Sequence, residues 1–107
     1  MPRAKFQTLT EQMFYILLCL TEECYGMDIM DRVPQMTAGR VKVGSGTLYN
    51  LLEQFEDAGM IRLTKAVGRR RSYILTEKGK DMLKKEYDRI LAQAQDYRSV
   101  FGEEEAK

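Results

Sequence analysis

The sequence contains no histidine and only two cysteines, Cys19 and Cys24, among its 107 residues. Without histidine the common zinc-binding patterns cannot form, and no phosphate-binding loop of known spacing is present. We therefore expect no metal, no other cofactor and no catalytic residues. No apolar stretch near the start is long enough to span a membrane, and residues 1–7 lack the apolar segment of a signal peptide. These absences predict a cytoplasmic protein that is neither an enzyme nor a membrane protein.

Positive and negative charges are balanced in number but separated along the chain. Seventeen Lys and Arg residues accompany sixteen Asp and Glu residues, which gives a net charge of +1. Segments 32–52 and 58–76 carry basic residues and no acidic ones, whereas acidic residues gather in 53–57, in the last predicted helix and in 103–105. This separation suits a polyanionic partner, although a solvated basic loop explains the charges equally well. The length and the apolar share of 44% predict a single folded domain.

Two short helices are predicted in the N-terminal part. Thr8 and Glu11 have the spacing of a capping box ahead of the apolar run 13–20, which predicts a buried first helix. A polar turn, residues 21–24, follows it. A second helix is indicated by apolar residues at helical spacing, namely Tyr25, Ile29, Val33 and Met36. Pro34 should kink this helix or end it near the preceding residue.

A third helix and a β-hairpin come next. The helix is indicated by apolar residues at helical spacing, namely Leu48, Leu51, Leu52 and Phe55. Gly59 marks its C-terminal end. Alternating apolar and polar residues predict two short strands, 61–64 and 72–75, on either side of a turn at Gly68. Three helices followed by a hairpin is the order of a winged helix-turn-helix, in which the third helix enters the major groove of DNA.

The fourth helix is predicted to begin after Thr76 as its N-cap and to run to about residue 101. Its apolar residues follow the spacing of a heptad seam: Leu83, Tyr87, Ile90, Ala94, Tyr97 and Phe101. Such a seam favours a homodimer, with a helix folded back on its own domain as the alternative. The predicted fold is mainly α with a small β-hairpin. It combines a winged helix-turn-helix in residues 1–76 with a long C-terminal dimerisation helix and acidic tail in residues 77–107, as one compact unit.

The first half of the third helix carries polar side chains that suit contact with DNA. The candidates on or beside its outward face are Ser45, Thr47, Tyr49 and Asn50. Glu53, Glu56 and Asp57 would be repelled by phosphates, so contact should be confined to the first half of the helix. Two structural roles stay open, because Ser45 could cap the helix and Tyr49 could pack in the core.

The predicted wing carries three consecutive arginines, Arg69, Arg70 and Arg71, directly after the Gly68 turn. Alternation along a strand directs Arg69 and Arg71 to one face and Arg70 to the other. Additional basic candidates for DNA contact are Arg3, Lys5 and Lys42. Together these residues indicate double-stranded DNA as the partner. The alternative is a winged-helix protein-interaction module that uses the fourth helix for a foreign partner.

Four segments form a distinctive pattern: Tyr-Gly-Met-Asp-Ile at 25–29, Val-Gly-Ser-Gly-Thr-Leu-Tyr at 43–49, Phe-Glu-Asp-Ala-Gly-Met-Ile at 55–61 and Arg-Arg-Arg-Ser-Tyr-Ile-Leu-Thr-Glu-Lys-Gly at 69–79. In these segments the sequence resembles the PadR family of bacterial transcriptional regulators, specifically its short members with a single C-terminal helix. The resemblance implies a dimeric repressor of a palindromic operator. It implies that Thr47, Tyr49 and Asn50 face the major groove and that the wing arginines face phosphate. The identity of a small-molecule effector stays open.

Overall fold

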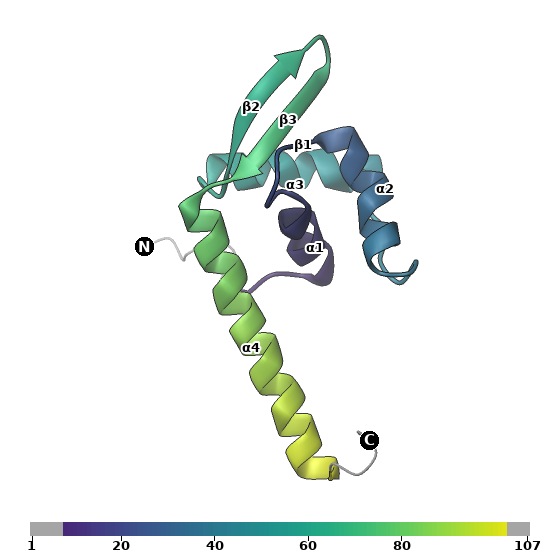
Figure 1. Cartoon of the computed structure of the whole chain (residues 1–107), viewed down its shortest axis with the longest axis vertical. Helices are drawn as coiled ribbons and strands as arrows, with labels where there is room; N and C mark the ends of the chain where they lie inside the picture. Colours follow the sequence, from purple (N-terminus) through teal and green to yellow (C-terminus); the bar gives the residue numbers. More distant parts are fainter. Residues whose placement is uncertain (1–7, 103–107) are drawn as a thin grey trace.

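A computed structural model describes residues 8–102 of the chain, which form helices around a small antiparallel sheet. In chain order the elements are α1 (Glu11–Cys19), β1 (Cys24–Tyr25), α2 (Gly26–Met36), α3 (Ser45–Asp57), β2 (Ile61–Val67), β3 (Arg70–Leu75) and α4 (Glu77–Phe101). In Figure 1 the hairpin of β2 and β3 extends from one end of the molecule and α4 extends from the other. The predicted winged helix-turn-helix with a long C-terminal helix is confirmed.

The start of α1 lies beyond the predicted cap. Thr10 is the N-cap, and its Oγ1 accepts a hydrogen bond from the backbone N–H of Met13 at 3.2 Å. The predicted capping box of Thr8 and Glu11 is wrong, because Glu11 is already the first residue of the helix. Leu9 is buried in the core just before the cap, and this burial determines where the chain enters the helix.

Pro34 does not end α2 near the preceding residue, which was one of the two predicted outcomes. The helix runs to Met36, two residues beyond the proline. The proline ring removes one N–H donor, but carbonyls of the last turn still find partners. The backbone N–H of Thr37 donates to the Val33 carbonyl at 3.1 Å, and that of Gly39 donates to the Pro34 carbonyl at 2.8 Å. The helix can therefore continue past the proline for the rest of its final turn.

The sheet contains a strand that the sequence did not predict. β1 has two residues and pairs antiparallel with β3, so the strand order is β1-β3-β2. Cys24 lies opposite Tyr73 in this pairing and is buried, although the sequence placed it in a polar turn. In the hairpin, the register shifts between Leu63 and Lys65, where Thr64 is the additional residue of a bulge.

The end of α3 and the start of α4 are held together. Gly59 has a φ of 78°, and the Met60 N–H donates to the Phe55 carbonyl at 2.9 Å, which ends α3 in a Schellman motif. Thr76 is the N-cap of α4, as predicted, and its Oγ1 also donates to the Gly59 carbonyl at 2.6 Å. A Cβ at Gly79 would lie 2.2 Å from the Met60 carbonyl oxygen. The close approach of these backbones therefore requires glycine there.

The core lies where α1, α2 and α3 meet the sheet. Its fully buried side chains include Ile16, Leu17, Leu20, Ile29, Leu48, Leu52, Phe55, Met60 and Ile61. Leu83 of α4 belongs to the same cluster. This core holds α3 and the hairpin in fixed relative positions. Within residues 8–102, none of the helices combines the length and apolar character that crossing a bilayer requires.

Candidate nucleic-acid interface

The first turns of α3 present polar side chains to solvent. The residues of α3 buried in the core are Leu48, Leu51, Leu52 and Phe55. Thr47 and Asn50 lie away from this buried face and are exposed. Ser45 is also exposed and is the first helical residue, because Gly44 occupies the N-cap. Since no side chain caps this end, its backbone N–H groups can serve an external anion.

Tyr49 lies between the exposed surface of α3 and the start of α2. Its side chain is 49% exposed, so it is not a core residue. A Cβ at Gly26 would come within 3.2 Å of Tyr49 Cε1. Glycine at the start of α2 therefore allows one edge of the ring to pack against that helix, while the rest of the ring extends the polar surface of α3 toward the wing.

Charged residues mark the two ends of this surface. The second half of α3 exposes acidic side chains, namely Glu53, Glu56 and Asp57. Lys42 is exposed in the loop before α3, where the Gln12 side-chain amide donates to its carbonyl at 2.8 Å. Arg3 and Lys5, the other two additional candidates, lie outside the described residues. The positive charge thus lies ahead of α3 and the negative charge along its second half.

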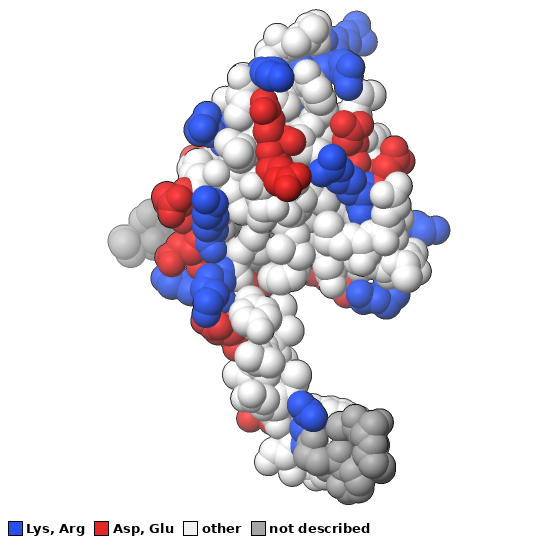
Figure 2. All heavy atoms as spheres, in the orientation of Figure 1, with Lys and Arg blue, Asp and Glu red and all other residues white. Residues whose placement is uncertain are grey.

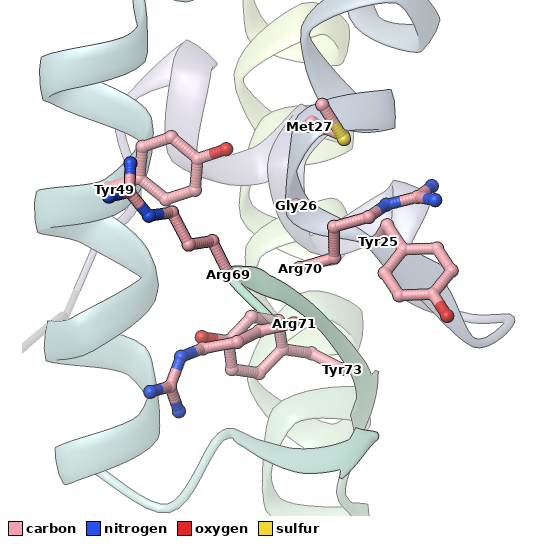
Figure 3. A pocket seen from close by; sticks show the side chains of 8 residues that line it. All are labelled: Tyr25, Gly26, Met27, Tyr49, Arg69, Arg70, Arg71 and Tyr73. Atoms are coloured by element: carbon pink, nitrogen blue, oxygen red, sulfur yellow. The ribbon is translucent and has the colours of Figure 1, made fainter. Parts of the chain in front are cut away.

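The hairpin tip directs its arginines to two sides. Gly68, with a φ of 60°, and Arg69 form the turn, and Arg70 and Arg71 begin β3. Figure 3 shows Arg69 and Arg71 directed toward α3 and Arg70 directed toward Tyr25. The Cζ atom of Arg70 lies 4.4 Å from the centroid of the Tyr25 ring, which is a cation–π contact. The expected alternation of the three arginines is therefore present.

A cleft of about 280 Å³ opens between the wing, α3 and the start of α2 (Figure 3). Its lining residues are Tyr25, Gly26, Met27, Tyr49, Arg69, Arg70, Arg71 and Tyr73. Three of these are arginines and none is acidic. Burial raises the pKa of Tyr73 above its ordinary value of 10.0, so this phenol is uncharged at neutral pH. The cleft therefore combines a positive charge with aromatic walls.

A hydrogen-bonded group at the base of the wing was missed by sequence reasoning. Ser72 Oγ donates to Glu23 Oε2 at 3.2 Å, and Thr64 Oγ1 lies 2.5 Å from Ser72 Oγ. Hydrogen bonds from Thr64 and, to a smaller extent, from Ser72 lower the pKa of Glu23. The group ties the turn before β1 to the bulge of the hairpin. No local pattern signals it, because Glu23 and Ser72 are 49 positions apart.

The predicted dimer seam divides into a buried and an exposed part. Leu83 is 8% exposed and packs in the core of its own chain. The other seam residues are exposed, namely Tyr87, Ile90, Ala94, Tyr97 and Phe101. Leu91 and Val100, which the seam pattern omitted, are exposed apolar residues as well. On the face shown in Figure 2 the lower part of α4 is largely uncharged, whereas Lys and Arg side chains gather at the hairpin tip.

A second cleft, of about 410 Å³, lies where α1 meets the beginning of this exposed part of α4. Its walls include Phe14, Tyr15 and the buried carboxylate of Glu86. The Arg89 Nε donates to Glu86 Oε1 at 3.1 Å. This bond, with a further hydrogen bond from the Leu9 backbone, holds the pKa of Glu86 below its ordinary value. The ion pair lies within α4, and the hydrogen bond from the Leu9 backbone joins Glu86 to the segment ahead of α1.

Both cysteines are buried free thiols. Burial raises the pKa of Cys19 to about 11 and also raises the pKa of Cys24. At neutral pH both thiols are therefore uncharged, and uncharged thiols are weak nucleophiles and metal ligands. The described part of the chain has no group of three or more Cys, Asp and Glu side chains that could hold a metal ion.

The sequence pattern of the Transcriptional regulator PadR-like family matches residues 16–85 of the chain. This match covers the last part of α1, the whole of α2, α3 and the sheet, and the first part of α4. No curated protein sequence matches the chain.

Several solved structures of transcriptional regulators are similar to this one. RosR of H. salinarum is 21% identical with a TM-score of 0.69, over 95% of this chain and 98% of its own. A PadR-like transcriptional regulator from Bacillus cereus is 22% identical with a TM-score of 0.69, over 85% and 91%. The PcaV transcriptional regulator from Streptomyces coelicolor is 16% identical with a TM-score of 0.71, over 94% and 68%. At these identities the likeness establishes a shared fold.

Proposed function

The chain belongs to the PadR-like family of transcriptional regulators, and from this we propose that it binds a palindromic DNA operator as a homodimer and represses transcription. One observation carries the proposal. Tyr49 of α3 and the arginines of the wing line the same cleft, no acidic residue lines it, and the other polar residues at the start of α3 are exposed. A winged helix contacts DNA with these two elements, the third helix in the major groove and the wing on the flanking backbone.

In the proposed complex the start of α3 reads the operator. Thr47, Tyr49 and Asn50 offer a hydroxyl, a phenol and an amide on the exposed side of the helix. An asparagine amide can bond adenine with two hydrogen bonds, whereas hydroxyl groups bond bases or phosphates. Ser45 and Lys42 lie at the N-terminal end of the helix, where they would contact the backbone. The acidic second half of α3 stays out of the groove.

The homodimer is proposed from the exposed apolar part of α4, residues 87–101. A face with Tyr87, Ile90, Tyr97 and Phe101 exposed on one helix is unusual for a surface that meets only water. Pairing with the same face of a second copy buries it and creates a two-fold axis. Two recognition helices related by this axis read the two halves of a palindrome. We propose that repression follows because a dimer bound to such a site in a promoter prevents RNA polymerase from binding there. A small-molecule effector stays a prediction.

The alternative, a winged-helix module that binds only proteins, is disfavoured by the wing. Arg69 and Arg71 lie on an exposed turn and strand, directed toward the exposed face of α3 (Figure 3). These neighbouring cations repel one another, and an anionic partner offsets that repulsion. The phosphates of DNA supply the negative charge whatever the base sequence is. A foreign protein partner would need a matching acidic surface.

The experiment is the salt dependence of DNA binding by an Arg69→Ala/Arg71→Ala variant. Each phosphate that a cation neutralises adds about 0.9 to the slope of log affinity against log salt. If both arginines of both wings contact phosphate, four contacts are lost and the slope should flatten by roughly three to four units. DNA selected from a random pool by the wild-type dimer provides the operator. Preference among sequences should barely change, because phosphates carry no base identity.

The matched control is Lys80→Ala/Lys85→Ala, which also removes two exposed cations from each subunit but on α4. Its slope should stay close to the wild-type slope. An unchanged slope for the wing variant, measured on folded dimer, would rule out the wing as a phosphate clamp. Failure of the wild type to select any sequence would return the protein-interaction module to favour.

A further inference from the structure

The cleft between the wing, α3 and α2 has a charge that selects an anion. Arg69, Arg70 and Arg71 approach it from two sides, because Arg70 is directed toward Tyr25 and the other two toward α3 (Figure 3). Glu23 and Asp28, the acidic residues nearest in sequence to Tyr25, Gly26 and Met27 of the cleft, are not among its lining residues. Three neighbouring positive charges without a carboxylate among the lining residues repel one another. The cleft therefore favours a negatively charged occupant.

The size of the cleft favours a piece of a polymer over a free ligand. At about 280 Å³ it lies just below the range of roughly 300–1,000 Å³ that is usual for small-molecule sites. A phosphodiester with its adjoining sugar is smaller than a drug-sized molecule and can extend out of the cleft in both directions along a strand. The aromatic and thioether walls from Tyr49, Tyr73 and Met27 suit the apolar side of a sugar. A nucleic-acid backbone thus matches both the charge and the volume.

Arg70 is held in place before any anion arrives. Its guanidinium lies over the ring of Tyr25, with Cζ 4.4 Å from the centroid. Tyr25 is itself fixed, because it belongs to β1 and pairs with Ser72 of β3. Stacking uses the flat face of a guanidinium and leaves the N–H groups at its edge free to donate. An arginine ordered in this way loses little side-chain entropy when it binds a phosphate.

From these observations we propose that the cleft seats one phosphodiester of the DNA backbone, and that Tyr25 positions Arg70 to donate to it. The proposal rests on the proposed function and names a contact within it. It distinguishes Arg70 from its neighbours, since Arg69 and Arg71 are directed toward α3 and not toward Tyr25 (Figure 3). It also gives Tyr25, which contributes no charge, a part in DNA binding.

The test combines protein variants with single neutral linkages in the selected operator. Each phosphate of one half-site is replaced in turn by a methylphosphonate, and the affinities of wild type and Arg70→Ala are measured for each duplex. At one position per half-site, the neutral linkage should weaken wild-type binding by about tenfold, the size of one charge-assisted hydrogen bond. At that position it should weaken the Arg70→Ala variant by much less, because the donor is already gone.

Two further variants separate the roles. Tyr25→Leu removes the ring but keeps the guanidinium, and it should reduce the tenfold effect at the same linkage by releasing Arg70. Lys65→Ala removes an exposed cation of β2 that does not line the cleft, and it should retain the full effect at that linkage. Circular dichroism and sedimentation confirm that each variant is folded and dimeric before binding is compared.

The outcomes separate the inference from the function on which it rests. If wild type binds the operator but the Arg70→Ala variant shows the wild-type loss at every linkage, the cleft seats no phosphodiester. If Arg70 couples to one linkage but Tyr25→Leu leaves that coupling intact, Tyr25 does not position the arginine. If wild type binds no DNA, the proposed function fails and the inference fails with it.

Discussion

The two halves of α4 form one continuous helix but have different surroundings. In the first half Gly79, Leu83 and Glu86 are buried against the chain's own domain. From Tyr87 onward every residue to Phe101 is exposed, including large apolar side chains. Burial within the chain therefore separates residues that build the fold from residues available to a partner, although both sets follow the same helical spacing. Substitutions in the first half should consequently reduce the stability of the fold, and substitutions in the second half should reduce dimerisation.

Gly79→Ala should give the largest effect, because it breaks the buried half. The new Cβ would lie 2.2 Å from the Met60 carbonyl oxygen and 2.8 Å from a methyl of Leu75, so the backbone of α4 and that of Met60, between α3 and β2, must separate. We expect a loss of about 3 to 5 kcal/mol in the free energy of unfolding, which lowers Tm by about 15 °C or more. Thermal unfolding followed by circular dichroism measures this change.

Gly46→Ala is the control for the glycine substitution. A Cβ at Gly46 meets no atom within 4 Å, and the residue lies in the first turn of α3. Alanine favours helix over glycine by about 1 kcal/mol, so Tm should stay the same or rise. A Gly79→Ala protein as stable as Gly46→Ala would show that α4 does not pack tightly against the backbone of Met60.

Ile90→Glu tests the exposed half and should act on assembly instead of folding. Ile90 is 42% exposed in the single chain, so a charge there is tolerated by the monomer. In the proposed dimer the two introduced carboxylates meet in an apolar interface, which costs about 3 kcal/mol or more. Sedimentation at micromolar concentration should show a monomer with helical content unchanged.

Ala92→Glu introduces the same charge on the opposite side of α4, where the neighbouring residues are exposed. It should remain dimeric. If Ile90→Glu sediments as a dimer like this control, the exposed half of α4 is not the main interface.

Asn50→Ala extends the comparison to α3, where buried residues again stabilise the fold and exposed residues are available to a partner. Asn50 is exposed, whereas its neighbours Leu51 and Leu52 are buried. If its amide meets a base, the variant should lose about 1 to 3 kcal/mol of affinity for the operator and little for random DNA. Fluorescence anisotropy with both duplexes measures the difference.

Glu53→Ala is the matched control one turn later, and it removes an exposed acidic side chain. It should keep or slightly raise affinity for both duplexes, because repulsion from phosphate is lost. Equal losses on operator and random DNA for Asn50→Ala would reassign that residue to the backbone.

Local patterns were enough to predict most elements of the fold. The helical spacing of Leu48, Leu51 and Leu52 indicated α3, and alternation around Gly68 indicated the hairpin. The same patterns indicated which polar residues of α3 are exposed. These features depend on residues close in sequence, so the sequence carries them directly.

Long-range features could not be predicted in the same way. β1 has only two residues and exists because Cys24 and Tyr25 pair with β3, far along the chain. The Tyr25 ring under Arg70 depends on the same pairing. Leu83 satisfies the heptad spacing but lies in the core, because a helix uses identical spacing to face its own domain or another copy. Contacts between residues far apart in sequence determine the presence of β1, the position of the Tyr25 ring and the burial of Leu83.

Glu86→Gln probes the boundary between the two halves and should give the smallest effect. The carboxylate is 4% exposed, and hydrogen bonds from Arg89 and the Leu9 backbone lower its pKa from the ordinary 4.5. A lowered pKa in the folded state means that the stabilisation is fully present above pH 4.5 and is lost as the pH falls through the folded value. Glutamine can keep the bond from Leu9 but not the charge, and solvent screens the half-exposed Arg89. We therefore expect a loss of about 1 kcal/mol at pH 7 that is smaller at pH 3.

Urea unfolding of wild type and variant at equal protein concentration, at both pH values, measures this difference, because shared titrations cancel in the comparison. Asp88→Asn is the matched control: its carboxylate pairs with Lys84 at 2.9 Å but is 55% exposed. Because solvent screens this pair, its removal should change the free energy of unfolding very little at either pH. A Glu86→Gln variant that behaves like Asp88→Asn would mean that the charge of Glu86, with its ion pair to Arg89 inside α4, stabilises the fold no more than an exposed pair does. The boundary between the two halves would then be set by apolar burial at Leu83 alone.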